Sequence, residues 1–188
     1  MTILNDAQTK VRAAVGLITP YDSNLQNGES YDLTIGDTIK LQRINWLKAI
    51  AEKLTKGVVT PASAYWEEID ISDTTQDNPF WLKRNIPLLA CSEQYLKMPA
   101  DLVAKGFLKS GRAREFLEHL QAVFIDATYE GVITLEHVNV SRTAMPIWKG
   151  MRVMQLTFEK TTPAAKPYKD RGHYQGDITV QESKGYFQ

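Results

Sequence analysis

Apolar residues recur at helical spacing in three stretches of the chain, and each stretch predicts a short helix. These stretches are residues 6–14, 44–54 and 110–119. Asn5 is followed three residues later by Gln8, which is typical of a capping box, and Gly16 is expected to end the first helix. Gly57 is a stop signal for the second helix. We expect the second helix to pack one face on the body of the protein.

Other apolar runs are short, rich in Val, Ile, Leu and Thr, and bounded by turn residues, which predicts strands. They are residues 31–35, 86–91, 132–138 and 153–158. Many short strands separated by turns favour a barrel or a double-sheet jelly roll with a few short helices. Residues 57–80 are expected to form an irregular excursion. The polar tail from Thr161 carries Pro163 and Pro167, which indicates an arm that leaves the core and covers a site or a neighbouring subunit.

The length and composition suit one compact domain with its own core. The chain has 188 residues, of which 43% are hydrophobic and 23% are charged. Lys and Arg number 22, as do Asp and Glu, so the formal net charge is zero. A general nucleic-acid binder carries a basic surplus, because its affinity comes from neutralising phosphates. We therefore expect no nucleic-acid partner, and any phosphate site must be a local cluster of cations.

Cys91 is the only cysteine, which excludes an internal disulfide and a Cys/His zinc site, including that of the zinc deaminases. We expect it to be a buried apolar residue. No apolar run approaches the roughly 18 residues that span a membrane. The first 20 residues carry charges throughout, unlike a signal peptide. We therefore expect a cytoplasmic protein without a membrane partner.

Histidine and tryptophan residues offer no ligand set of their own. His119 and His137 have no third metal-type partner at useful spacing, so we interpret them as surface or strand-face residues. The tryptophans are interpreted as packing residues rather than as base-stacking platforms. They are Trp46, Trp66, Trp81 and Trp148.

A basic cluster begins the third expected helix. Lys109, Arg112 and Arg114 place three cations within six residues, and Ser110 and Gly111 leave backbone amides accessible beside them. Guanidinium groups together with helix N-terminal amides can bind an anion such as a triphosphate. A solvated basic helix face is the alternative.

Glu136 lies within the apolar run 132–138. A carboxylate in the core of a strand is costly unless it is paired or its pKa is raised, and such a group is a candidate acid or base. Because side chains alternate along a strand, Glu136 shares a face with Thr134. A plain outward-facing position is therefore the other interpretation.

Four segments in this order resemble the dCTP deaminase and dUTPase superfamily of trimeric jelly rolls. They are SYDLTIG (30–36), KSGRAR (109–114), IDATYEGVITLEHVN (125–139) and GMRVMQL (150–156). Two further groups of residues resemble the deaminase branch. They are ILND (3–6) with GLI (16–18) and Pro20, and Pro167, Tyr168, Arg171, Tyr174, Gln175 and Gly176 in the tail. The resemblance covers nearly the whole chain, with residues 40–80 unmatched.

The resemblance implies a mainly β fold, a dUTPase-like distorted jelly roll or β-barrel, that forms a homotrimer with sites between subunits. Residues 1–188 would be one dCTP deaminase-like domain, with 40–80 as a variable excursion and 161–188 as a C-terminal arm. The implied activity is hydrolytic deamination of dCTP to dUTP and ammonia without zinc. Mg²⁺ would be bound with the triphosphate, and dUTP or dTTP are possible further ligands.

The resemblance also implies roles for individual residues. Glu136 would be the general base and acid, Arg114 would pair with it, and Ser110 with the backbone carbonyl of Ala122 would hold the water and the exocyclic amine. Asp126 would contact the sugar. The implied substrate-binding residues are Lys109, Gly111, Arg112, Ala113, Asp126, Tyr129, Thr134, Leu135, Gln155, Tyr168, Arg171, His173, Tyr174 and Asp177.

Some positions keep simpler interpretations. Asp126 can be a turn residue and Tyr129 a packing residue. Gly111 stands where deaminases usually have a second serine. Asp177 stands where a glutamine is common, and its charge is unfavourable near a triphosphate unless Mg²⁺ or an arginine intervenes. Two rival functions remain: a dUTPase-like or bifunctional pyrophosphatase that uses Asp126 and yields dUMP, and a non-catalytic nucleotide-binding regulator.

Overall fold

The computed structural model describes residues 2–120 and 122–184. Its helices and 3-10 turns are α1 (Asp6–Ala13), η1 (Ser23–Leu25), α2 (Trp46–Lys56), η2 (Pro61–Ser63), α3 (Ser110–Arg114) and η3 (Tyr168–Asp170). Its strands are β1 (Ile18–Thr19), β2 (Tyr31–Ile44), β3 (Ala64–Asp70), β4 (Phe80–Leu82), β5 (Pro87–Lys97), β6 (Leu102–Leu108), β7 (Leu117–His119), β8 (Phe124–Ile125), β9 (Glu130–Asn139), β10 (Met145–Ile147) and β11 (Arg152–Lys160). None of these helices is long and apolar enough to cross a membrane.

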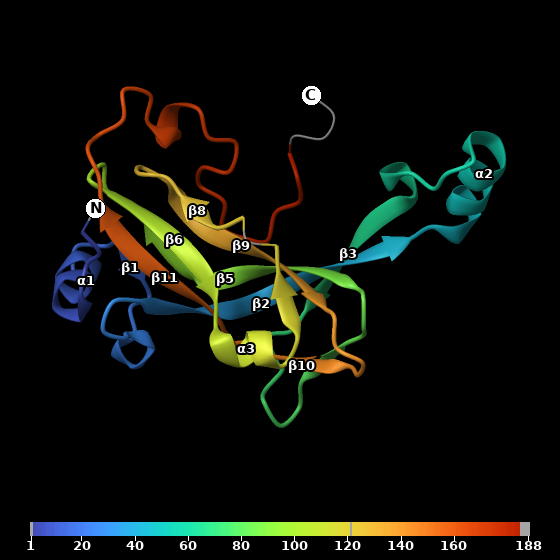
Figure 1. The fold of residues 1–188 in the computed structure, drawn as a ribbon, viewed down its shortest axis with the longest axis horizontal. Coiled ribbons are helices and arrows are strands. Elements are labelled where there is room, and N and C mark those ends of the chain that lie inside the picture. The colour runs from blue at the N-terminus through green and yellow to red at the C-terminus, as the bar shows by residue number, and fades with distance from the viewer. Residues whose placement is uncertain (1, 121, 185–188) are drawn as a thin grey trace.

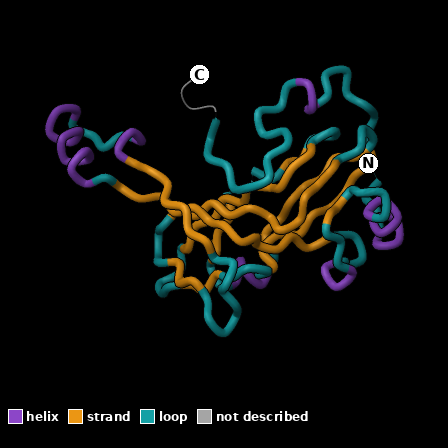
Figure 2. The backbone as a smooth tube through the Cα atoms, turned by 180° about the vertical axis from the view of Figure 1, so that it is seen from behind, coloured by secondary structure: helices purple, strands orange, loops and turns teal. Residues whose placement is uncertain are grey.

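One curled antiparallel sheet dominates the described chain (Figures 1 and 2). Its order is β7-β9-β5-β2-β11-β6-β8, with β1 paired to β5 and β3 paired to β2, and β10 and β4 form a separate ribbon. The four strands predicted from apolar runs are confirmed as parts of β2, β5, β9 and β11. The predicted mainly β fold with a few short helices is confirmed as well.

The core lies inside the curl of the sheet. Alternate residues of the long strands point into it, as the pleat requires. Tyr31, Leu33 and Ile35 of β2 are fully buried, and so are Leu135 of β9 and Leu156 of β11. The expectation that Cys91 is buried is confirmed.

The capping box predicted for α1 is confirmed. The Asn5 side chain accepts a hydrogen bond from the Gln8 backbone amide, and the Gln8 side chain accepts one from the Asn5 amide. Val11, Val15 and Leu17 gave a partial apolar stripe, which is wrong for Val11 and Val15, because both are exposed, whereas Leu17 is buried. The helix contacts the body through smaller residues that are buried, Thr9 and Ala13.

The third helix is shorter than predicted, because the chain turns into a strand. α3 ends at Arg114, and Phe116 takes a left-handed backbone conformation with φ 63°. Leu117 and His119 then pair with β9 and point inward. The apolar residues of 110–119 are at helical spacing, but the pairing of β7 with β9 overrides this local signal.

Residues 38–70 form a projecting arm, so the irregular excursion predicted for 57–80 is wrong for 64–70, which is strand β3. β2 and β3 pair from Thr38 with Asp70 to Ile44 with Ala64, and α2 lies at the far end (Figure 1). Gly57 ends α2 in the left-handed conformation, as predicted. The expectation that α2 packs an apolar face on the body is wrong, because Leu47 and Leu54 are each 83% exposed.

The C-terminal tail folds back over the same chain. The Val132 amide donates to the Asp177 carbonyl (2.9 Å), and the Gln181 amide donates to the Thr134 hydroxyl oxygen (3.1 Å). Val180 is 1% exposed and packs with Leu89 and Val132. The tail therefore covers one face of β9, as the expectation of an arm over a site requires.

Candidate active site

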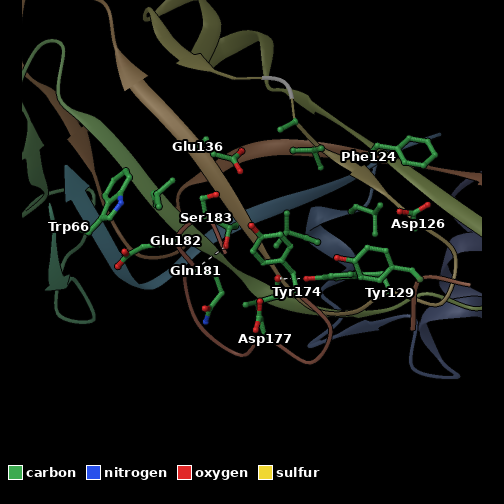
Figure 3. Close-up of a pocket in the computed structure, with 18 residues that line it drawn as sticks. Trp66, Phe124, Asp126, Tyr129, Glu136, Tyr174, Asp177, Gln181, Glu182 and Ser183 are labelled. Carbon is green, nitrogen blue, oxygen red and sulfur yellow. Dashed lines mark hydrogen bonds between the residues drawn. The ribbon is translucent and has the colours of Figure 1, made fainter. Parts of the chain in front are cut away.

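A pocket of about 480 Å³ lies between β8, β9, the base of the arm and the folded tail (Figure 3). Eighteen residues line it: Trp66, Leu89, Ala122, Val123, Phe124, Ile125, Asp126, Tyr129, Val132, Ile133, Thr134, Glu136, Tyr168, Tyr174, Asp177, Gln181, Glu182 and Ser183. We call it the glutamate pocket. It brings together residues from positions 66 to 183, which only the folded chain can do.

Glu136 points into this pocket from β9 (Figure 3). It shares the less buried face of the strand with Thr134, as the outward-facing interpretation predicts, and the folded tail encloses that face. Its side chain is 29% exposed. Its Oε2 is buried and has no hydrogen-bond partner within the part of the chain that the structure describes. Burial raises the pKa of this carboxyl, so it is suited to exchange protons.

His119 is the titratable side chain next to Glu136. The pairing of β7 with β9 sets His119 opposite His137, and the two rings meet edge to face at 4.9 Å. His119 Nε2 lies 3.5 Å from Glu136 Oε2. The interpretation of these histidines as surface residues is wrong, because they are 1% and 2% exposed. The inward side of a paired strand explains their burial.

Burial keeps both histidines neutral. It lowers the pKa of His119 to about 4, and burial together with the neighbouring ring lowers the pKa of His137 to about 3. His137 Nδ1 lies 3.3 Å from the Glu118 carbonyl oxygen. A neutral His119 leaves the charge of Glu136 uncompensated, which is consistent with the raised pKa of that carboxyl.

This pair predicts an acid-sensitive fold. An unfolded histidine has a pKa near 6.5, so unfolding takes up protons below that pH. The stabilising contribution is complete above pH 6.5 and is lost as the pH falls toward the lowered folded values. Between about pH 7 and about pH 5, we expect the free energy of unfolding to fall by about 2 kcal/mol for each histidine.

Denaturant unfolding of wild type and His137→Phe tests this prediction. The variant should lose less stability on acidification, and equal losses would contradict the assignment. Because Glu136 is present in both proteins, their difference isolates the histidine.

Ala122 lines the pocket beside Glu136 because its segment lies close against β6. The Gly106 amide donates to the Val123 carbonyl (2.9 Å). A Cβ on Gly106 would lie 2.4 Å from Val123 Cγ1, so a larger residue would push the segment away from the pocket. The Ala122 carbonyl accepts a hydrogen bond from the Phe124 amide at 3.2 Å.

Asp126, Tyr129 and Tyr168 form one wall of the glutamate pocket. Tyr129 is buried, its hydroxyl donates to the Val132 carbonyl (2.6 Å), and its ring meets that of Tyr168 at 5.6 Å. Burial raises the pKa of Tyr129. Arg171 lies 3.9 Å from an Asp126 carboxylate oxygen. Tyr129 therefore has a packing role, and Asp126 keeps a partly exposed carboxylate in the pocket.

Asp177 enters the pocket with its charge already paired. Lys184 Nζ contacts both carboxylate oxygens of Asp177, at 2.8 and 2.9 Å, and lies 5.0 Å from the Tyr174 ring centre. Lys184 thus pairs with the Asp177 carboxylate, a role that was expected of Mg²⁺ or an arginine. His173 is exposed and outside the pocket lining, and its carbonyl accepts a bond from Lys184.

The basic cluster lies in a different place. A second pocket of about 330 Å³ is lined by Gln76, Lys109, Gly111, Arg112, Trp148, Gly150, Met151 and Arg152. Lys109 pairs with the buried Asp32 (2.6 Å), and Arg112 pairs with Glu115 (2.5 Å) and lies 5.6 Å from the Trp148 ring centre. We call it the basic pocket. It presents three cations, each paired with a carboxylate, because Arg152 also lies 3.7 Å from Asp32.

The two pockets share no lining residue. α3 lies on one side of the curled sheet and the C-terminal tail on the other (Figures 1 and 2). Ser110, Ala113 and Arg114 lie on α3, and Arg114 is exposed and makes no ion pair with Glu136 within the described residues. One copy of the chain therefore does not bring the predicted catalytic residues together.

Five predicted binding residues line neither pocket: Ala113, Leu135, Gln155, Arg171 and His173. The Leu135 side chain is in the core, so only its backbone is available on the pocket side. Gln155 is on β11 in register with Asp32, close to the basic side of the sheet. Residues 2–120 and 122–184 hold no group of three His, Cys, Asp or Glu side chains that fits a metal ion.

Sequence reasoning missed several residues of the glutamate pocket. Trp66 was interpreted as packing, and it does pack on the cluster around Leu89 while also lining the pocket. Trp46 and Trp81 are exposed, so the packing interpretation is wrong for them. His119 and the residues 181–183 carried no motif. The pairing of the strand that carries His119 with the strand that carries Glu136 is the signal that could have indicated the contact between them.

Comparison with known proteins places these features in a family. Residues 3–161 match the family described as dCTP deaminase-like. The "dCTP deaminase, dUMP-forming" of Methanosphaera stadtmanae is 32% identical over 98% of this chain and 94% of its own, and that of Methanobrevibacter smithii is 31% identical over 98% and 95%. The crystal structure of 2'-deoxycytidine 5'-triphosphate deaminase from Agrobacterium tumefaciens is 20% identical and superposes with a TM-score of 0.64 over 85% of this chain. This chain spans 48% of that longer chain.

Proposed function

Because the chain belongs to the dCTP deaminase-like family, we propose that it deaminates dCTP by hydrolysis, without zinc and with Glu136 as general base and acid. The observation that carries the proposal is the Glu136 carboxylate in an enclosed pocket, with one buried oxygen that lacks a hydrogen-bond partner within the described chain. A buried acceptor without a protein partner is costly. A water or a pyrimidine amine in the pocket would satisfy it.

The reaction requires one group that takes and gives protons. The ionised Glu136 removes a proton from a water as the water oxygen bonds to C4 of cytosine. Glu136 delivers this proton to ring N3, which leaves a tetrahedral C4 that carries a hydroxyl and the amine. It then takes the proton of that hydroxyl and passes it to the amine, so the C4–N bond breaks, ammonia leaves, and the C4 carbonyl of uracil forms. The raised pKa makes the Glu136 carboxylate a stronger base for both proton abstractions.

The nucleotide would lie along the glutamate pocket. Ala122 would offer a backbone carbonyl for the water or the amine, Asp126 would contact the sugar, and the packed Tyr129 would shape the wall beside it. Tyr168 and Tyr174 of the tail would close over the bound ligand. Mg²⁺ would arrive with the triphosphate as part of the substrate, since the described residues offer no metal cluster of their own. A dUTP or dTTP ligand would use the same contacts.

The active unit is a homotrimer in this proposal, with each site between two subunits. The glutamate pocket and the basic pocket are separate within one chain, yet the proposed chemistry needs both. A neighbouring subunit would supply Ser110, Arg114 and the basic pocket from α3. Arg114 is exposed and unpaired with Glu136 in its own chain, so it is available for a neighbour. We propose a cytoplasmic location for this activity.

A second candidate product is dUMP. The curated relatives are named as dUMP-forming, and Asp126 lines the same pocket as Glu136. A carboxylate near the sugar can orient a second water for attack on the phosphate chain. Release of pyrophosphate would then follow deamination and give dUMP rather than dUTP.

Chromatography of a single incubation separates these functions. Wild-type protein is mixed with dCTP, dCMP or dUTP and Mg²⁺, and nucleotides, ammonia and pyrophosphate are quantified. Deamination to dUTP with ammonia supports the main proposal, and dUMP with pyrophosphate supports the bifunctional enzyme. Binding of dCTP without any product would overturn both and favour a regulator.

We expect the activity to fall on acidification at a higher pH than an ordinary glutamate, near 4.3, would give. The carboxylate is the active form, burial raises its pKa, and protonation removes the base. The measurement is kcat/KM against pH. A matched Glu136→Asp variant should shift this acidic limb. A limb that stays at the same pH in the variant would belong to the nucleotide base instead.

A further inference from the structure

α2 is folded with its polar side inward and its apolar side outward. Of its residues only Ala49 and Glu52 are buried. At 3.6 residues per turn, Trp46, Ile50 and Leu54 form one stripe, with Leu47 beside it. These four side chains are 72%, 55%, 83% and 83% exposed. A surface helix of a soluble protein normally buries such a stripe, so another surface is needed to cover it.

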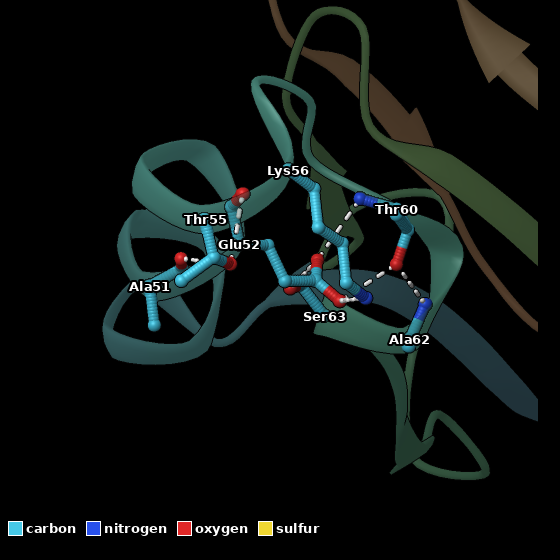
Figure 4. Close-up of polar contacts among 7 residues, drawn as sticks. All are labelled: Ala51, Glu52, Thr55, Lys56, Thr60, Ala62 and Ser63. Atoms are coloured by element: carbon cyan, nitrogen blue, oxygen red, sulfur yellow. Dashed lines mark hydrogen bonds and ion pairs between the residues drawn. The ribbon is translucent and has the colours of Figure 1, made fainter.

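Glu52 holds the helix in this orientation (Figure 4). Its carboxylate accepts hydrogen bonds from the Ser63 hydroxyl (2.5 Å), the Thr60 amide (2.9 Å) and the Thr60 hydroxyl (2.7 Å). These bonds lower the pKa of Glu52 to about 2, and Lys56 adds an ion pair at 3.5 Å. The helix therefore cannot turn its apolar stripe inward without breaking this network.

The arm carries the stripe away from the rest of the chain. β2 and β3 form a ribbon of seven paired positions, and α2 lies beyond its end (Figures 1 and 2). The body of the same chain does not cover α2 in either view. An occupant must therefore come from another molecule.

The outer side of β7 has a complementary pattern. Phe116 and Leu120 are 62% and 67% exposed, and Glu118 lies exposed between them on the same side of the strand. β7 is an edge of the large sheet.

Lys53 lies exposed at the edge of the stripe on α2, three residues after Ile50 and seven after Trp46. Its ammonium donates only to the Gly57 carbonyl (2.7 Å), and neither Lys53 nor Glu118 forms an ion pair within the described residues. An apolar stripe with a cation thus matches an apolar stripe with a carboxylate.

We propose that α2 of one copy of this chain docks on the outer side of β7 of a second copy. Trp46, Leu47, Ile50 and Leu54 would cover Phe116 and Leu120, and Lys53 would pair with Glu118. Such a contact joins two different surfaces and closes into a ring when the rotation between copies permits it. The inference rests on the association of copies in the proposed function and adds the surfaces that hold them together.

The test measures molar mass in solution by light scattering after gel filtration, over a dilution series of the full chain. Wild type should be oligomeric, and Leu47→Glu/Leu54→Glu should dissociate at a concentration at least about tenfold higher. Both positions are exposed, so the monomer should keep its circular dichroism spectrum. Val15→Glu, a similarly exposed apolar position just after α1, should leave the mass unchanged.

Charge reversal identifies the partner surface. Lys53→Glu and Glu118→Lys should each weaken the oligomer, and the double variant should restore it. A monomeric wild type, or an oligomer that Leu47→Glu/Leu54→Glu leaves intact, overturns the proposal. So does binding of α2 to phosphatidylserine vesicles with no change in oligomer mass. Absence of product from a wild-type protein that behaves as expected in these measurements would count against the proposed function alone.

Discussion

Replacement of Glu136 by glutamine is expected to lower the deamination rate of dCTP by about 10²- to 10⁴-fold, the usual contribution of a general acid and base. Glutamine keeps the size and the hydrogen-bonding oxygen of the side chain, but it cannot take a proton from water. The glutamine side chain would occupy the same partly enclosed position on β9, so the pocket should remain intact. The measurement is ammonia release under single-turnover conditions.

Nucleotide binding distinguishes chemistry from folding in this variant. Affinity for dCTP should change little, because the amide can still accept a hydrogen bond from the exocyclic amine. Glu182→Gln, the same substitution at another carboxylate of the same pocket, is the matched control and should keep most of the rate. Turnover near the wild-type rate in Glu136→Gln would remove Glu136 from its proposed role.

Mixing two inactive variants is expected to restore activity. Glu136→Gln lacks the proton carrier of the glutamate pocket, and Ser110→Ala lacks the hydroxyl on α3. The two positions lie on separate pockets of one chain. If each site joins two subunits, about a quarter of all sites in random trimers from an equal mixture are wild type. The mixture should therefore turn over dCTP far faster than either parent.

Two controls make the mixing result specific. The double variant Glu136→Gln/Ser110→Ala mixed with wild type should only dilute the activity. Mixing without subunit exchange, at low temperature after separate purification, should give no recovery. A mixture with activity equal to the sum of its parents would mean that each site is built within one subunit.

The glutamate pocket shows which features the residue pattern predicts and which depend on the whole fold. Alternation along residues 132–138 put Glu136 and Thr134 on one face, and the structure has them there. The pattern did not contain the tail, which encloses that face through Val180 and Gln181. Contacts between β9 and a segment more than forty residues later depend on the whole fold. The same holds for His119, whose burial follows from strand pairing and not from its neighbours in sequence.

Local signals determined the elements that depend on neighbouring residues. The capping box at Asn5, the stop at Gly57 and the four apolar strands were readable because their causes lie within a few positions. The order of motifs also identified the family. Tertiary structure alone decided that α2 faces outward and that α3 and Glu136 lie apart. Helical spacing shows which face of a helix is apolar, but whether that face is covered depends on where the arm carries it.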